Sequence, residues 1–315
     1  MADHPLQRRV AIVLLGVVAL AWGTTWPVTK AILEYLPPLW TTALRSAIAG
    51  VALFGISAAR GHVIVPRRGD IPIVLNIVLL HMVAFSGLVA IGLQFVPAGR
   101  SVVLGYTTPL WVMVGAHFFL GEALSRGQAI GIAFGLAGLM LLFSPASFDW
   151  TDTNALLGNA LVLLAAFCWA ASIVHVRTHQ WVSTPFELIP WQVLIATFVL
   201  AALAAAFEGW PRVSWTIELW ELLVYGGVVG IAVPYWATVT VNRSLPAITT
   251  SVGLLGVPVV GVLCSAIALG EPVTFALVMA LGLIVTGIAI GTNVPGFIRR
   301  ADTASPDKED GEEGG

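Results

Sequence analysis

The sequence predicts an all-α integral membrane protein of ten transmembrane helices, arranged as two five-helix repeats of inverted topology. Three observations predict it: a scarcity of charge, a regular series of apolar runs, and motifs that recur halfway along the chain. Of the 315 residues, 58% are hydrophobic and 10% are charged, and the mean hydropathy is +0.91. A soluble domain carries about 25% charged residues. The composition therefore favours a membrane protein.

The distribution of charge strengthens this interpretation. Three of the 32 charged residues lie within residues 1–9 and nine lie within 299–315, which leaves 20 for residues 10–298. So few charges could not cover the surface of a soluble domain of this size. The net charge of −2 also gives no basic surface of the kind that nucleic acid requires. We therefore expect a lipid bilayer, and no nucleic acid, as a partner.

Apolar runs bounded by proline, glycine and charged residues mark the individual spans. A membrane helix needs about 20 apolar residues, and each run is close to this length. The first run resembles a signal peptide, with Ala19-Leu20-Ala21 as a cleavage pattern, but it stays apolar through Trp22 and Trp26, so we interpret it as a retained helix. The predicted spans are 10–30, 38–59, 71–93, 97–120, 127–145, 154–176, 185–207, 217–241, 246–269 and 273–292.

Positive charge predicts the orientation of these spans. With the N-terminus inside, 11 of the 15 Lys and Arg residues fall on the inner side, three fall outside (Lys30, Arg100 and Arg212) and Arg45 lies within a span. Cytoplasmic loops are the ones enriched in Lys and Arg. We therefore predict a multi-pass protein of the cytoplasmic (inner) membrane with both termini cytoplasmic. Residues 1–9 form the cytoplasmic N-terminus, and the acidic, glycine-rich segment 299–315 forms a disordered cytoplasmic tail.

An internal repeat divides the chain into residues 10–145 and 154–292. A shift of 149 residues places Pro109 on Pro258, and a shift of 147 places Trp22 on Trp169. Each repeat holds five spans, and an odd number gives the second copy the opposite orientation, as in many secondary transporters. The 149-residue shift also places Pro97-Ala98 on Pro246-Ala247 and Leu120-Gly121-Glu122 on Leu269-Gly270-Glu271.

Several of these motifs together resemble a known family. In order along the first repeat they are Ala21-Trp22-Gly23-Thr24-Thr25-Trp26-Pro27, Pro97-Ala98-Gly99-Arg100, Pro109-Leu110-Trp111 and Leu120-Gly121-Glu122-Ala123-Leu124. The chain is similar over residues 10–295 to the EamA-type family of the drug/metabolite transporter superfamily. The resemblance implies a ten-helix carrier with both termini cytoplasmic, of a kind that often exports amino acids or related metabolites.

We therefore expect a secondary transporter that exports a small-molecule substrate, an amino acid or a related amphipathic compound, by alternating access. A channel or facilitator is one alternative, and a membrane-embedded lipid-modifying enzyme is another. The enzyme is disfavoured because Asp149 and Asp152 are the only close pair of Asp residues outside the tail and no HExxH, GxSxG or P-loop motif is present. We expect no catalytic residue, metal or cofactor, and the oligomeric state stays open, a monomer included.

Aromatic and polar side chains within the spans are the candidate substrate-binding residues. A cation inside a span is costly, so Arg45 either holds an anionic group such as a carboxylate or is satisfied structurally, by snorkelling or by pairing with a carbonyl or with Glu34. His81 and the aromatic residues either wall a cavity for an amphipathic or zwitterionic solute or fill gaps between helices. The candidates are Trp22, Thr25, Trp26, Arg45, His81, Phe85, Tyr106, Trp169, Ser172, Tyr235 and Trp236.

Proline, glycine and glutamate at span positions have predicted structural roles. Pro109 and Pro258 are repeat mates that predict a shared kink or hinge. Glu122 precedes Arg126 by four residues, which predicts an ion pair if the turn is helical. Small-residue seams that pack helices are predicted in the fifth and tenth spans, at Gly127, Gly131 and Gly135 and at Gly287 and Gly291.

Overall fold

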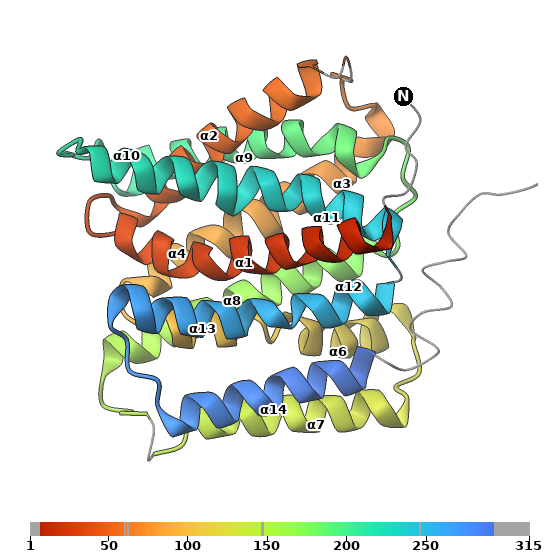
Figure 1. Cartoon of the computed structure of the whole chain (residues 1–315), viewed down its shortest axis with the longest axis vertical. Helices are drawn as coiled ribbons and strands as arrows, with labels where there is room; N and C mark the ends of the chain where they lie inside the picture. Colours follow the sequence, from red (N-terminus) through yellow and green to blue (C-terminus); the bar gives the residue numbers. More distant parts are fainter. Residues whose placement is uncertain (1–6, 60, 62, 146–147, 246, 293–315) are drawn as a thin grey trace, which may run out of the picture.

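The computed structural model describes residues 7–59, 61, 63–145, 148–245 and 247–292. Every regular element within these ranges is helical, and the long helices run side by side across the bundle (Figure 1). Residues 1–6, the predicted tail 299–315 and Pro246 of the repeated motif lie outside the described residues.

The first half of the chain forms the five helical runs that the sequence predicts. Two of these runs are composite, because the helix changes its hydrogen-bonding pattern or breaks along its length. In order, the elements are α1 (Arg8–Ile32); α2 (Pro38–Ala59); η1 (Arg68–Asp70), α3 (Ile71–Asn76), η2 (Ile77–Phe85) and α4 (Ser86–Leu93) as one run; α5 (Ala98–Gly105) and α6 (Thr108–Leu120) as another; and α7 (Arg126–Leu142).

The second half repeats this order, and its composite runs fall in the equivalent places. The elements are α8 (Thr153–Val176); α9 (Pro185–Phe207); α10 (Ile217–Val224), η3 (Tyr225–Ala232) and α11 (Val233–Ser244) as one run; α12 (Ala247–Leu254) and α13 (Gly256–Leu269) as another; and α14 (Phe275–Thr292).

Eight of the described runs are long and apolar enough to cross a bilayer, and two further apolar helices, Arg126–Leu142 and Gly256–Leu269, are shorter. Large apolar side chains cover the outside of the bundle, where Val51, Phe119, Phe198 and Ile267 are 67–84% exposed. A soluble protein rarely exposes apolar surface on this scale. The prediction of an all-helical, multi-span membrane protein is therefore confirmed. Because two of the apolar helices are shorter than a full crossing, the count of ten spans stays a prediction.

Two helix breaks stand just before the repeated prolines. α5 ends at Gly105 and α6 begins at Thr108, so that Pro109 lies in the first turn of α6. Pro258 lies likewise in the first turn of α13, which begins at Gly256. Proline is tolerated in a first turn because its missing N–H would have no partner there. The prolines therefore start new helices rather than bend continuous ones.

Two π-helical segments, η2 and η3, also occupy equivalent places, because Ile77 and Tyr225 begin them 148 residues apart. π-helical turns are rare and are found frequently at functional sites. η2 carries His81 and Phe85, and η3 carries three glycines. Both segments face the interior of the bundle, between the halves.

The predicted glycine seams pack α7 against α14. A Cβ atom on Gly131 would lie 2.4 Å from the carbonyl oxygen of Gly287, and one on Gly287 would lie 2.5 Å from the carbonyl oxygen of Gly131. Only glycine lets two backbones approach so closely. The seam is confirmed at these positions, and Gly291 also lies against Gly131. The two halves are therefore joined along one side of the bundle, where α7 and α14 lie together (Figure 1).

The remaining helices interlock the halves through exchanged contacts. α1 of the first half packs against α13 of the second, and α8, the equivalent of α1, packs against α6, the equivalent of α13. α2 packs against its own equivalent α9. The core is shared by both halves, since Leu93 and Leu110 lie in one buried cluster with Val262 and Ile284. The space between the halves is consequently lined by both.

Candidate functional site

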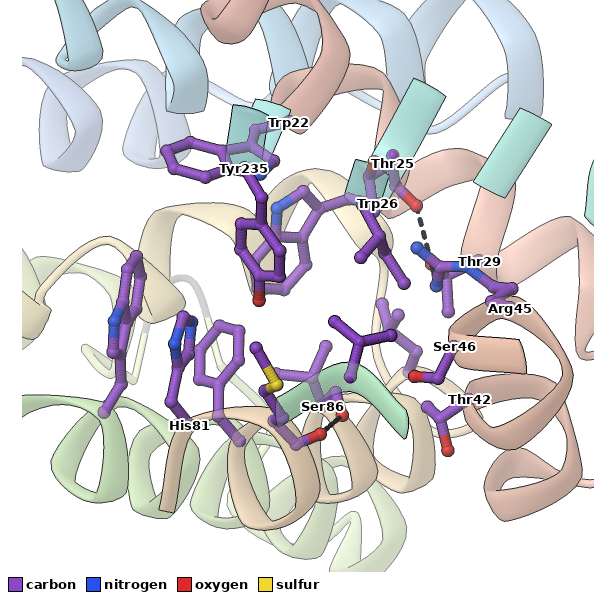
Figure 2. A pocket seen from close by; sticks show the side chains of 18 of the residues that line it. Trp22, Thr25, Trp26, Thr29, Thr42, Arg45, Ser46, His81, Ser86 and Tyr235 are labelled. Carbon is purple, nitrogen blue, oxygen red and sulfur yellow. Dashed lines mark hydrogen bonds between the residues drawn. The ribbon is translucent and has the colours of Figure 1, made fainter. Parts of the chain in front are cut away.

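A cavity of about 130 Å³ lies between the halves, near the middle of the bundle. Its size is close to the ~150 Å³ of an engineered protein cavity that binds benzene. The cavity therefore suits a small molecule. Figure 2 shows the lining side chains converging from several helices. They come from α1, α2, η2, α4, α8, α9, η3 and α11 and from Tyr106 after α5.

One side of the cavity is a cluster of aromatic rings around Trp169. The imidazole of His81 stacks on this indole with centroids 5.1 Å apart and planes 3° apart. Phe85 lies 4.9 Å from the same ring, and Tyr106 meets it edge-on at 6.1 Å. Tyr235 meets His81 edge-on at 6.2 Å. These rings offer a flat apolar surface on which the body of a solute can stack.

The first helix supplies a second aromatic wall and hydroxyl groups. Trp22, Thr25 and Trp26 of α1 all line the cavity. Trp26 packs against Gly105, where a Cβ atom would lie 2.6 Å from the indole. Thr25 donates its hydroxyl hydrogen bond to the carbonyl of Ala21 at 2.8 Å. The repeat mates Trp22 and Trp169 thus both contribute to the same cavity, each from its own half.

Arg45 lies on the opposite side of the cavity from His81 (Figure 2). Only 6% of Arg45 is exposed, so the side chain does not snorkel. One terminal nitrogen donates to the hydroxyl of Thr29 at 2.5 Å, and the other to the carbonyl of Gly226 at 3.4 Å. The predicted carbonyl partner is thus present, in η3.

Nine of the eleven predicted residues line the cavity, and Ser172 and Trp236 do not. Ser172 is 2% exposed and donates a hydrogen bond to the side-chain oxygen of Asn76 at 2.8 Å, so it joins α8 to the α3–η2 run. Trp236 follows Tyr235 on α11, and because adjacent helical residues point about 100° apart, its side chain is directed away from that of Tyr235 and is not part of the lining.

The structure adds lining residues that the sequence did not single out. Half of them lie one helical turn from a predicted residue, and this spacing was the only available signal. Thr29 follows Thr25 on α1 in this way. The π-helical register of η2 and η3, which no periodicity rule anticipates, positions several others. The added residues are Thr29, Thr42, Ser46, Met82, Ser86, Val89, Leu93, Val193, Gly230 and Ile231.

Two ion pairs join the halves on either side of this cavity, and we call them the clasps. In the first, Glu271 accepts hydrogen bonds from the backbone N–H groups of Ala98 and Gly99 at 2.7 and 2.8 Å and lies 3.9 Å from Lys30. Its carboxylate therefore caps the positive N-terminus of α5. In the second clasp, Arg177 donates to Glu122 at 2.8 Å.

The clasps are equivalent under the sequence repeat. Glu122 corresponds to Glu271 and Lys30 corresponds to Arg177, so each half supplies one acid and one base. The predicted pair of Glu122 with Arg126 is wrong, because residues 121–125 are not helical and the i, i+4 geometry is absent. Arg177, which is distant in the sequence, takes that place.

A further hydrogen bond to a carboxylate also joins the two halves. The hydroxyl of Tyr35 donates a hydrogen bond to Glu218 at 2.8 Å. This bond to a carboxylate raises the pKa of Tyr35 above its ordinary value. It links the loop after α1 to the start of α10.

Comparison with known proteins places this architecture. Residues 9–144 and 156–292 each match the EamA-like transporter family. The chain is 28% identical over 283 residues to YoaV, an uncharacterized transporter of Bacillus subtilis, with 89% of this chain and 96% of that protein covered. It is 29% identical over 297 residues to a probable amino-acid metabolite efflux pump of Escherichia coli, with 88% and 93% covered.

A solved crystal structure shows the same fold, with a TM-score of 0.65 over 91% of this chain and 99% of that chain at 24% identity. The family matches fall on the two halves that the repeated motifs define, and they cover most of the sequence. The resemblance drawn from the motifs is thereby confirmed: the chain belongs to the EamA-like transporter family.

Proposed function

We propose that this protein is a secondary transporter that exports a small metabolite, an amino acid or a related amphipathic compound, across the cytoplasmic membrane by alternating access. The observation that carries the proposal is the small aromatic cavity that both halves line. In transporters built from repeats, the substrate binds between the repeats near the middle of the bilayer. The name of the Escherichia coli relative supports amino-acid metabolites as the substrate class.

We also propose ten membrane crossings in two inverted repeats, residues 10–145 and 154–292. The two shorter helices, α7 and α13, then count as crossings, since each is the equivalent of a longer apolar run. The 11-to-3 split of positive charge supports an inner N-terminus. The exchanged packing of α1 on α13 and α8 on α6 is expected for halves related by a two-fold axis in the membrane plane.

The clasps give this architecture two gates. With the N-terminus inside, Lys30 near the end of α1 places the Glu271 clasp at the outer surface, and the Glu122–Arg177 clasp at the inner one. Opening one clasp while the other stays closed exposes the cavity to one side at a time. The helix breaks before Pro109 and Pro258 provide the hinges about which α6 and α13 swing.

Purified protein in proteoliposomes loaded with amino acids and amphipathic metabolites should release at least one of them at least about tenfold faster than protein-free vesicles, the difference that a barrier lowered by about 1.4 kcal/mol produces. The efflux rate should reach a maximum as the internal substrate concentration rises, because each transport cycle carries only the substrate that the cavity holds. Radiolabel or mass-spectrometric efflux measures it. Linear, unsaturable flux would indicate a channel instead, and no flux of any tested class would overturn the proposal.

Breaking either clasp should make the cavity accessible to a labelling reagent from one side of the membrane only. In a chain without Cys168 and Cys264, which are both free, a cysteine at Ser46 reports on the cavity. Glu271→Gln should raise its labelling by an impermeant maleimide outside intact cells about tenfold, because bonds to a charged group contribute about 1.5–3 kcal/mol. Glu122→Gln should raise labelling from the inside in inverted vesicles.

Two further variants complete this experiment. Glu221→Gln changes an exposed carboxylate of α10 and should leave labelling at Ser46→Cys unchanged on both sides. A cysteine at Thr178, beside the inner clasp, should react only once the membrane is permeabilised. Reaction of Thr178→Cys in intact cells would reverse the proposed topology, and equal labelling in the two clasp variants would remove the gating role.

A further inference from the structure

Arg45 is a buried cation whose charge no side chain in the described part of the chain neutralises. Its two bonded partners, the Thr29 hydroxyl and the Gly226 carbonyl, are both uncharged. Its Nε atom is buried and has no hydrogen-bond partner. The ion pairs within the described ranges are the two clasps, and neither includes Arg45. A buried charge is ordinarily paired, so this one points to a partner that arrives from outside the chain.

The helix that faces Arg45 is shaped around it. A Cβ atom on Gly226 would lie 2.6 Å from the Nε of Arg45, and one on Gly230 would lie 2.7 Å from the hydroxyl of Thr25 and 3.3 Å from a terminal nitrogen of Arg45. The glycines of η3 therefore leave just enough room for the guanidinium. Because the surrounding backbone holds it at the cavity wall, the guanidinium is preorganised for a ligand and cannot swing out to solvent.

The rest of the described lining offers no acidic side chain that could pair with a second charge. No Asp or Glu is among the described residues that line the cavity. Its polar groups are the hydroxyls of Thr25, Thr29, Thr42, Ser46, Ser86, Tyr106 and Tyr235, the indole N–H groups and the imidazole of His81. An ammonium group of a substrate would thus find no carboxylate to pair with, while its apolar body would meet the rings around Trp169.

We propose that the cavity selects its substrate by a carboxylate, bound to Arg45, and by an apolar body, while the amino group of an amino acid contributes little. This inference rests on the proposed function and names the substrate class of the same site. A guanidinium has five N–H donors in a planar fork, and two of the five are used here, so donors remain for carboxylate oxygens. The preferred ligands are small apolar monocarboxylates, with or without an amine.

Binding to the purified full-length protein tests this directly, with leucine and phenylalanine as parent ligands. Each parent is compared with its amide, its decarboxylated amine and its deaminated acid, by quenching of tryptophan fluorescence and by thermal shift. The deaminated acid should bind within about threefold of the parent. The amide and the amine should bind at least about tenfold more weakly, because they lose a charge-assisted bidentate contact.

Variants assign the discrimination to Arg45. Arg45→Met should reduce the affinity for the acid at least about tenfold and leave that for the amine unchanged, so that the preference disappears. Arg45→Lys, which keeps the charge and loses the fork, should be intermediate. Arg100→Met is the matched control: Arg100 bonds to Asn159 and to the carbonyl of Leu142, away from the cavity, and its loss should leave the acid-to-amine ratio unchanged.

Three outcomes would overturn the inference. Amines or amides that bind as tightly as the acids would show that the carboxylate is not recognised. If chloride or phosphate raised the unfolding temperature as much as the acids do, the site would be an unselective anion site. No binding of either series would exclude this substrate class. If neither series bound but an uncharged or cationic compound left the proteoliposomes, the proposed transporter function would hold and only the carboxylate preference would be wrong.

Discussion

Trp169→Ala is expected to reduce transport at least about tenfold, and in the limit to abolish it, while the protein still inserts and folds. The indole contacts His81, Phe85 and Tyr106, and each aromatic pair contributes about 0.5–1.5 kcal/mol beyond its buried area. Its removal takes away the surface on which the substrate stacks and lets the neighbouring rings collapse into the cavity. Initial efflux rates over a range of internal substrate concentrations measure the effect.

Three companion variants separate a role in binding from a role in folding. Leu164 lies on the same helix and is 49% exposed on the lipid side, so Leu164→Ala should transport normally. Trp169→Phe keeps a flat ring and should restore part of the activity. His81→Ala removes the other half of the stacked pair and should resemble Trp169→Ala. Normal efflux in both alanine variants would remove these two residues from the site.

Gly287→Ala is expected to destabilise the folded protein by about 1–3 kcal/mol, the usual cost of adding a methyl group to a close-packed interface. The new Cβ would lie 2.5 Å from the carbonyl oxygen of Gly131 and 3.0 Å from the backbone nitrogen of Gly135, both in α7. Backbone atoms cannot rotate away as a side chain can, so the two helices must separate. Thermal unfolding in detergent, followed by aggregation or by cysteine reactivity, measures the change.

Gly282→Ala provides the matched control on the same helix. No atom lies within 4 Å of the position of its Cβ, and Gly282 is exposed. Both substitutions gain about 1 kcal/mol of helix propensity, so their difference isolates the contact with α7. Gly282→Ala should be neutral or stabilising. Equal unfolding temperatures for the two variants would contradict the proposed close approach of α7 and α14.

The sequence predicted the helical architecture well because composition and periodicity are local properties. Apolar runs of bilayer length can satisfy their backbone hydrogen bonds only as helices, so segments such as 38–59 and 185–207 could be bounded almost to the residue. The order of proline, tryptophan and glutamate motifs predicted the family. The aromatic residues and Arg45 were singled out because polar and ring-bearing side chains are unusual within such runs.

Contacts between distant segments could not be predicted in this way. Arg177 pairs with Glu122 across 55 residues of sequence, whereas the local rule favoured Arg126. Ser172 was a candidate for the cavity lining, yet it donates a hydrogen bond to Asn76 on a neighbouring run and lies outside that lining. Similarly, Glu271 reaches back to Ala98 and Gly99 at the start of α5. Pairing partners depend on which helices become neighbours.

The sequence by itself determined that this chain is a duplicated helical membrane protein, because hydropathy and repeated motifs are written along the chain. Only the tertiary structure decided which side chains share the cavity and that Arg45 lies there with uncharged partners. It also decided that η2 packs against helices of the second half and η3 against helices of the first half. The physical reason is that a binding site arises from side chains brought together by the packing of separate helices. That packing depends on the whole bundle at once and not on any one run of residues.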